Sequence, residues 1–365
     1  MKTATRISKL PKYVGGKPID ELQRELGIDR PIKLASNENP NGPSPKSLEA
    51  LSRSILDVAS YPDGDSYHLK RKICEKENIL PNQIVIGNGS NEILELISHA
   101  FIEKDDEVIM GEYCFIVYPI VAMLSEARII RSKMPNMTHD IQDIIDLVSD
   151  NTKVIFIANP NNPTGTKVPK EEIYKLLDSI PSNILVVVDE AYNEVTSEPE
   201  TNSMVDLVRD GYNVAISRTF SKIYGLAGQR VGYMIGQPDV INEIRFNGTG
   251  EASLSMAGVS AAIASYEDKY FMNFSRDKIN QAKEIVEQGL KSNGLSYLPS
   301  ETNFILVNLG SIDADKFRDE MLKENILIRG KYGDYHNWSR VSMGNLSDVQ
   351  RYVDAIPKAL TNLSV

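Results

Sequence analysis

The stretch RTFSKIYGLAGQRVGY, residues 218–233, brings a lysine, two hydroxyls and an arginine into one short segment. Lys222 carries a primary amine, which can form a Schiff base with an aldehyde. Thr219 and Ser221 supply hydroxyl groups just before it, and Arg230 supplies a guanidinium after it. Hydroxyls and a forked cation suit a doubly charged phosphate. The stretch therefore predicts a phosphate-bearing ligand attached through Lys222. The alternative is a flexible loop with a surface lysine, because short motifs also arise by chance.

A second segment, IGNGSNEILELI (residues 86–97), has the pattern of a strand end, a glycine turn and a helix start. The first turn of a helix presents backbone N–H groups and the positive end of the helix dipole. We therefore expect Gly89, Ser90 and Asn91 to form a phosphate cradle. The alternative is an ordinary helix start capped by the side chain of Ser90 or Asn91.

Two further segments join an apolar strand to polar residues. IFIANPNNPTG (155–165) ends in a proline-rich turn that can hold Asn162 rigidly toward a ligand. ILVVVDEAYNE (184–194) predicts a fully buried strand ending in Asp189, at the edge where open α/β sheets bind ligands. A carboxylate there could keep a pyridine nitrogen protonated, and Tyr192 could reach a phenolic oxygen on the same ring. Together the four segments predict pyridoxal 5'-phosphate. Taken singly, Asp189 could be a helix cap and Tyr192 a core aromatic.

The chain resembles the fold-type I, class I and II aminotransferases, and most closely their histidinol-phosphate aminotransferase branch. The similarity runs from YVGGKPIDEL (13–22) and KLASNENPNGPSP (33–45) to IRGKYGDYHNWSRVSMG (328–344). It implies an α/β fold whose large lobe has a mostly parallel sheet flanked by helices, beside a smaller α+β C-terminal lobe. It also implies an enzyme that moves an amino group from an amino substrate to a 2-oxo acid.

The resemblance implies a role for each residue of the expected cofactor site. Lys222 is the Schiff-base lysine, and Asp189 is the partner of the pyridinium nitrogen. Phe115 corresponds to the aromatic ring that stacks on the cofactor. Tyr61 corresponds to a tyrosine that reaches the cofactor phosphate of the neighbouring subunit, which implies a homodimer. The remaining residues bond the ring oxygen (Asn162 and Tyr192) or surround the phosphate (Gly89, Ser90, Asn91, Thr219, Ser221 and Arg230).

Two arginines are candidates for substrate binding. Arg340 corresponds to the family arginine that binds the anionic end of the substrate, and a planar guanidinium suits a carboxylate or a phosphate. Arg329 would add a second positive charge, although a surface salt bridge is an equally good interpretation. Together they favour a doubly anionic substrate, such as a phosphorylated amino compound of the histidinol phosphate type.

Some segments depart from the histidinol-phosphate branch. RFNGTGEASLSMAG (245–258) lacks the usual proline-aromatic-asparagine pattern. His336 and Trp338 are candidate substrate contacts, though Trp338 could equally pack the small lobe. YPDGDSYHL, with His68, also resembles decarboxylases of phosphorylated amino acids such as phosphoserine or phosphothreonine. Decarboxylation is therefore the alternative reaction, and an inactive cofactor-binding regulator is a weaker third possibility.

Composition limits the partners and the location. The 365 residues carry a net charge of −10, which argues against a nucleic acid partner because a phosphate backbone requires a basic face. No apolar run has the length of a membrane-spanning helix, so we expect no membrane association. Cys74 and Cys114 are the only cysteines, and their spacing does not suit a metal. Reduced thiols in a cytoplasmic protein are the expected interpretation.

Short apolar runs alternate with helical segments through most of the chain, which predicts an α/β domain. We expect strands near residues 83–86, 106–110, 153–158, 184–188, 213–217 and 231–235. Residues 46–250 would form the large cofactor-binding domain and 251–365 the small C-terminal domain. Residues 1–45 would be an N-terminal segment that joins the small domain.

Overall fold

The computed structural model describes residues 10, 19–27, 31–247, 253–333 and 335–363. The chain divides into two compact units. The larger unit contains Pro43–Asn162 and Thr166–Lys269, and the smaller one contains residues 19–42, Pro163–Gly165 and the chain from Tyr270 onward. The boundaries expected after residues 45 and 250 remain predictions about domains. Part of the quoted segments 13–22 and 245–258 lies outside the described residues.

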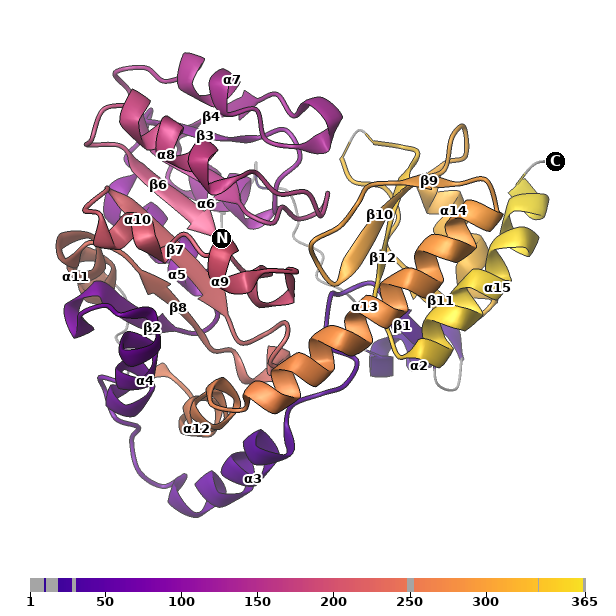
Figure 1. Ribbon diagram of the computed structural model, residues 1–365, viewed down its shortest axis with the longest axis horizontal. Coiled ribbons are helices and arrows are strands. Elements are labelled where there is room, and N and C mark those ends of the chain that lie inside the picture. Colours follow the sequence, from indigo (N-terminus) through magenta and orange to yellow (C-terminus); the bar gives the residue numbers. More distant parts are fainter. Residues whose placement is uncertain (1–9, 11–18, 28–30, 248–252, 334, 364–365) are drawn as a thin grey trace, which may run out of the picture. The chain divides into compact units, whose positions relative to one another are not determined.

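A seven-stranded sheet forms the centre of the larger unit, in the order β2-β8-β7-β6-β5-β3-β4 (Figure 1). The strands β7, β6, β5, β3 and β4 are parallel, whereas β8 is antiparallel to both of its neighbours. This mostly parallel sheet confirms the predicted α/β fold class. The strands are β2 (Ile84–Gly87), β3 (Glu107–Gly111), β4 (Arg128–Ser132), β5 (Thr152–Ala158), β6 (Leu185–Asp189), β7 (Val214–Thr219) and β8 (Gly232–Ile235).

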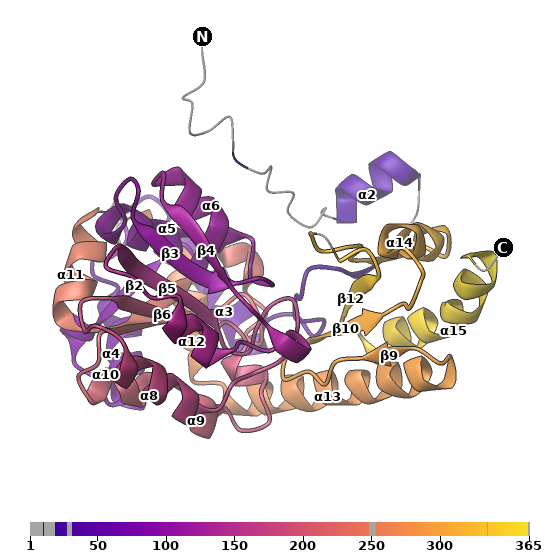
Figure 2. The ribbon, with the colours of Figure 1, turned by 90° about the horizontal axis from the view of Figure 1, so that it is seen from above.

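Helices cover both faces of this sheet, and Figure 2 shows α5 and α6 on one side with α8 and α9 on the other. The helices of the larger unit are α3 (Pro45–Ser54), α4 (Tyr67–Glu77), α5 (Ser90–Phe101), α6 (Val117–Leu124), α7 (Ile141–Asp146), α8 (Lys170–Ser179), α9 (Pro199–Asn202), α10 (Val205–Arg209), α11 (Pro238–Asn247) and α12 (Met256–Tyr266). Short 3-10 helices are η1 (Ile55–Asp57), η2 (Pro81–Gln83), η3 (Pro135–Met137), η4 (Asn193–Val195) and η5 (Ala227–Gln229).

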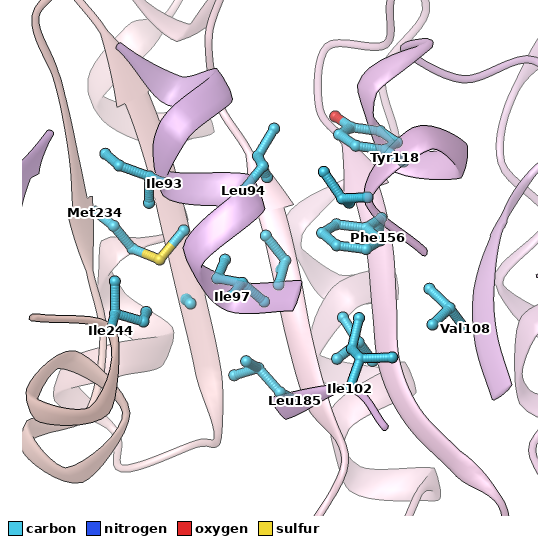
Figure 3. Packing of buried hydrophobic residues seen from close by; sticks show 14 of the residues in the cluster. Ile93, Leu94, Ile97, Ile102, Val108, Tyr118, Phe156, Leu185, Met234 and Ile244 are labelled. Atoms are coloured by element: carbon cyan, nitrogen blue, oxygen red, sulfur yellow. The ribbon is translucent and has the colours of Figure 1, made fainter. Parts of the chain in front are cut away.

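A hydrophobic cluster fills the space between α5 and the sheet (Figure 3). Ile93, Leu94 and Ile97 form one apolar stripe because residues three and four apart share a helix face. They belong to the same buried cluster as Leu185 of β6 and Met234 of β8. This packing fixes the first turn of α5 near the ends of the central strands.

All five residues of β6 are buried, as its apolar run predicted. Leu185 and Val187 belong to the α5-side cluster, while Val186 and Val188 do not. Because side chains alternate along a strand, Asp189 continues the α5 side and the next residue turns to the opposite face. The strand therefore ends with an acid on each face of the sheet.

The smaller unit contains two short sheets, with orders β1-β11 and β12-β10-β9. The strand β1 pairs in parallel with β11, so part of the N-terminal segment adds to this unit. Its elements are α2 (Ile19–Leu26), β1 (Ile32–Leu34), α13 (Lys269–Ser292), β9 (Ser296–Tyr297), β10 (Phe304–Asn308), α14 (Ala314–Lys323), β11 (Ile326–Ile328), β12 (Trp338–Ser342) and α15 (Leu346–Leu363).

Three strands, β1, β4 and β9, were not predicted from sequence. The strand β4 begins with an arginine and has two more polar residues, because it lies at the sheet edge and is only partly buried. The strand β9 has only two residues, too few to show alternation. Among the helices that the structure describes, none combines the length and the apolar character needed to cross a bilayer.

Candidate active site

Lys222 follows β7 and lies beside Tyr192, which follows the adjacent strand β6. The Lys222 Nζ is 5.5 Å from the centre of the Tyr192 ring. Lys222 is half-buried and Tyr192 is buried. Because β6 and β7 are parallel neighbours, their carboxyl ends bring these side chains to one edge of the sheet. An amine, an aromatic hydroxyl and a carboxylate are thereby gathered at this edge.

The carboxylate is Asp189, the last residue of β6, and it is 5% exposed. Its Oδ2 accepts a hydrogen bond from the Tyr118 hydroxyl at 2.7 Å, and its Oδ1 accepts one from the Ala191 N–H at 3.1 Å. Burial raises the pKa of Asp189, while the two hydrogen bonds and the charge of Lys222 oppose that increase. The acid is thus buried yet supplied with groups that favour its ionised form.

Three of the expected phosphate ligands contact one another. The Thr219 hydroxyl donates to Ser221 Oγ at 3.0 Å, and Arg230 Nη1 donates to the same oxygen at 3.2 Å. Arg230 Nη2 also donates to the carbonyl of Asn88, just before the start of α5, at 3.3 Å. Arg230 has the left-handed backbone conformation, with φ of 55°, which is uncommon for a residue with a side chain. The guanidinium is exposed and lies beside the glycine turn.

The turn before α5 requires a glycine. Gly89 has φ of 82°, and a Cβ at this position would be 2.3 Å from Arg230 Nη2. Gly89 is also the residue that precedes α5, and no side chain of the described residues caps this helix. The interpretation in which Ser90 or Asn91 caps the helix is therefore wrong, because the helix already begins at Ser90. The first N–H groups of α5 have no acceptor within the helix and can bind an anion.

Asn162 and Phe115 lie on turns that follow neighbouring strands of the sheet. Asn162 is half-buried just after β5, and the preceding Asn161 donates through its side chain to the Tyr113 carbonyl at 2.9 Å. Phe115 is half-buried after β3, with its ring edge-on to Tyr118 at 5.8 Å. The hydrogen bond between these turns ties the segments of Asn162 and Phe115 together.

Tyr61 is set apart from the other candidates. Its side chain is 95% exposed, on the loop between η1 and α4. The structure of one chain therefore does not bring Tyr61 into contact with the cofactor-site candidates.

Arg340 and Arg329 belong to the smaller unit, where they are joined through backbone hydrogen bonds of 3.0 and 3.3 Å. The Arg340 side chain is buried and donates to the Ala35 carbonyl at 3.0 Å. The Tyr332 ring lies 5.2 Å from the Arg340 guanidinium and 5.8 Å from that of Arg329. Within the described part of the chain, Arg329 forms no salt bridge with a carboxylate. Two cations thus share one aromatic ring.

Tyr118 is a site residue that was not identified from the sequence. It lies three residues after Phe115 in EYCFIVY, a spacing that places both side chains on one face of a helical turn. That spacing from Phe115 is the sequence feature from which Tyr118 could have been predicted as a site residue. Of the other candidates, His68 is exposed on α4, His336 is exposed before β12, and Trp338 is half-buried at the start of β12.

Comparison with known proteins gives a family and close relatives. Residues 29–356 match the family described as aminotransferase class I and II. Histidinol-phosphate aminotransferase 2 of Pseudomonas fluorescens is 40% identical, over 97% of this chain and 96% of its own. Histidinol-phosphate aminotransferase 1 of Idiomarina loihiensis is 38% identical over 96% of each chain. The structure of histidinol-phosphate aminotransferase from Sinorhizobium meliloti, in complex with pyridoxal-5'-phosphate, superimposes with a TM-score of 0.92. It is 26% identical and covers 99% of this chain and 98% of its own.

Proposed function

Because the chain belongs to the class I and II aminotransferase family, we propose that it is a pyridoxal phosphate-dependent aminotransferase for a phosphorylated amino substrate such as histidinol phosphate. A 2-oxo acid would be the amino acceptor. The observation that carries the proposal is the meeting of Lys222, Tyr192 and Asp189 at the ends of adjacent parallel strands. Transamination is preferred to the alternative decarboxylation because the relatives at 38–40% identity are named aminotransferases.

The chemistry of the phosphate end fits the cofactor. Thr219, Ser221 and Arg230 provide two hydroxyls and a guanidinium, and α5 begins beside them. Ser90 and Asn91 are the first two residues of this helix, where free N–H groups favour an anion. Gly89 leaves the space that a Cβ would take from the Arg230 guanidinium. This donor set supports binding of a phosphate dianion.

The ring end fits as well. Asp189 would hold a proton on the pyridine nitrogen, Asn162 and Tyr192 would bond the ring oxygen, and Phe115 would lie against the ring. When bound, pyridoxal phosphate supplies an electron sink that weakens a bond at the substrate Cα. Lys222 Nζ would first hold the cofactor covalently and then, once displaced by substrate, take the proton from Cα as a general base.

We propose that Arg340 and Arg329 bind the anionic groups of the substrate. Arg340 is fixed by the Ala35 carbonyl and by the rings of Phe304 and Tyr332, so its guanidinium has little freedom to lose on binding. The Arg329 guanidinium lies 5.8 Å from the centre of the same Tyr332 ring. Two positive charges held by one ring would suit a dianion, such as a phosphate, better than a single carboxylate.

An exposed apolar segment supports the proposed homodimer. Large hydrophobic side chains between residues 48 and 67 are 50–95% exposed. They are Leu48, Ile55, Leu56, Val58, Tyr61 and Tyr67. Single exposed apolar residues are ordinary, but a contiguous group marks an interaction surface. A second copy of the chain would cover this segment and receive Tyr61 in its active site.

The dimer can be tested by sedimentation. We expect Leu56→Lys to shift the protein to a monomer and weaken cofactor binding. Leu80→Lys is the matched control, because Leu80 is 62% exposed outside the segment. A dimer that persists in Leu56→Lys, or a wild-type monomer, would contradict this part of the proposal.

The two cysteines support a cytoplasmic location. Cys74 and Cys114 are both free thiols, and burial raises the pKa of each. Unpaired, unreactive thiols are typical of reducing compartments. We therefore propose that the enzyme works in the cytoplasm.

The function itself is tested with purified protein and pyridoxal phosphate. Borohydride should fix the cofactor to wild-type protein and to Lys104→Ala, which changes an exposed lysine, but not to Lys222→Ala. Histidinol phosphate without a 2-oxo acid should then yield one equivalent of ketone and no carbon dioxide. Continuous release of carbon dioxide from a phosphorylated amino acid would instead establish a decarboxylase, and failure to bind the cofactor would overturn the whole proposal.

A further inference from the structure

Tyr118 is held in one position by three elements. It lies on α6 and is fully buried. Its ring stacks on Phe156 of β5, with 4.9 Å between ring centres and 5° between planes. Phe115 packs edge-on against it at 5.8 Å. Rings packed in this way cannot turn freely. The Tyr118 hydroxyl is thereby held 2.7 Å from Asp189 Oδ2, to which it donates a hydrogen bond.

Asp189 has its two oxygens held by different donors. Tyr118 donates to Oδ2 at 2.7 Å from a helix, and the Ala191 N–H donates to Oδ1 at 3.1 Å from the turn after β6. Donors on both oxygens fix the plane of the carboxylate. They also favour the charged form, which burial disfavours. An acid that must hold a proton on a ring nitrogen has to be ionised itself.

The Tyr118 hydroxyl keeps its proton, and so remains a donor, beyond the pH at which an ordinary tyrosine loses it. Burial, followed by the charge of Asp189, raises the pKa of its hydroxyl well above the ordinary value. The other titratable groups facing this pair are Lys222, Cys114 and Tyr192. Of these three, Lys222 alone is positively charged. The direct donors to the carboxylate in the described part of the chain are the Tyr118 hydroxyl and the Ala191 N–H.

We propose that Tyr118 is a positioning residue that orients Asp189 and keeps it ionised for the cofactor ring. This inference rests on the proposed function. Phe115, which would lie against the cofactor ring, packs on the same tyrosine. One residue would therefore link the group expected on the ring face with the group expected at the ring nitrogen. If Tyr118 only filled space, a phenylalanine would serve equally well.

The test compares Tyr118→Phe with Tyr352→Phe, which removes another fully buried hydroxyl from the smaller unit. In cofactor-free protein labelled at the aspartate carboxyl carbons, we expect the pKa of Asp189 to rise in Tyr118→Phe alone. In cofactor-bound protein we expect the affinity for pyridoxal phosphate to fall about tenfold or more. The loss of affinity on acidification should also begin at a higher pH than in the wild-type protein. When Asp189→Asn is already present, adding Tyr118→Phe should not change the pH dependence of cofactor affinity any further.

An unchanged titration of Asp189 in folded Tyr118→Phe would overturn the inference, as would equal effects of the two tyrosine variants. If Tyr118→Phe does not fold, the wild-type protein still decides. The Tyr118 hydroxyl proton should exchange slowly with water and give an NMR signal whose chemical shift changes as Asp189 is protonated. A chemical shift that does not change with the protonation of Asp189 would contradict the inference. If wild-type protein bound no cofactor, the proposed function would fail, while the titration would still measure the Tyr118 effect.

Discussion

The ends of β6 and β7 present two different polar clusters, one on each face of the same sheet. On the α5 side lie Asp189 and Thr219, with Lys222 nearby. On the opposite side lie Glu190 and Arg218, the immediate chain neighbours of Asp189 and Thr219. Alternation along the strands separates the two clusters. Neighbouring residues along each strand therefore belong to different clusters. One cluster is the candidate ligand site, and the other consists of contacts within the protein.

The opposite cluster is closed on itself. Arg218 Nε donates to Glu190 at 2.8 Å, Nη1 to Glu77 at 2.9 Å and Nη2 to Ser203 at 2.6 Å. The side chains of Arg218 and Glu190 are 3% and 0% exposed. Glu194 lies 3.9 Å from the same guanidinium. By contrast, Arg230 on the cofactor side is exposed, and among the described residues its hydrogen-bond partners are a hydroxyl and two carbonyl oxygens.

The difference shows how the sheet separates stability from function. Arg218 has carboxylate partners from distant parts of its own chain, so its charge is compensated on folding. Arg230 has none among its hydrogen-bond partners, so a bound phosphate would supply the opposite charge. The same residue type thus stabilises the fold on one face and would bind a ligand on the other.

The largest effect is expected from Arg218→Met. It would leave buried carboxylates without their cation, a change that costs about 3–5 kcal/mol of unfolding free energy. Arg230→Met should change stability by less than about 1 kcal/mol, because the side chain is exposed, but should weaken cofactor binding. Urea unfolding of cofactor-free protein measures the first effect and cofactor titration the second. Equal losses of stability in the two variants would remove the distinction between the faces.

A second effect concerns pH. Burial raises the pKa of Glu190 to about 7, although Arg218 opposes this, and three carboxylates share one guanidinium. Between the ordinary glutamate pKa of 4.5 and about 7, the folded cluster holds more protons than the unfolded chain. Stability should therefore fall by roughly 3 kcal/mol as pH rises through this window. Glu190→Gln should flatten this slope in unfolding measurements, and exposed Glu75→Gln should leave it unchanged. If Glu190→Gln kept the steep dependence of unfolding free energy on pH, a group other than Glu190 would have to bind the proton.

The cofactor-side cluster could be anticipated from sequence more fully than the opposite one. An apolar run ending in Asp189, and a lysine three residues past the end of β7, are local patterns with a chemical reason. The pairing of Arg218 with Glu77 joins residues 141 positions apart, so no local sequence pattern predicts it. Tyr118 was missed for a similar reason, because its partner Asp189 is 71 residues away. Tyr61 was recognised only by family resemblance.

A third effect separates backbone strain from crowding at the phosphate turn. Gly89→Ala places a Cβ 2.3 Å from Arg230 Nη2, whereas Gly211→Ala meets nothing within 4 Å. Both glycines have positive φ, of 82° and 88°. Both variants should lose about 1–3 kcal/mol of stability from backbone strain. Only Gly89→Ala should also weaken cofactor binding, which fluorescence titration would detect. Similar cofactor affinities in the two variants would show that Arg230 tolerates displacement.

The smallest effect is expected from Tyr224→Phe, two residues after Lys222. Tyr224 is fully buried beside Phe220 and Tyr266, on the side of the opposite cluster, where the charges of Glu194 and Arg218 act on it. Its hydroxyl has no hydrogen-bond partner among the described residues. Removing an unpartnered buried hydroxyl should change the unfolding free energy by less than about 1 kcal/mol and could increase it. Tyr118→Phe is the same chemical change at a hydroxyl that does have a carboxylate partner. Thermal unfolding and cofactor titration of both variants would show what the same tyrosine-to-phenylalanine change does on each face of the sheet. If Tyr224→Phe weakened cofactor binding as much as Tyr118→Phe, the two clusters would have to be coupled through the segment around Lys222, and the sheet would not keep them apart.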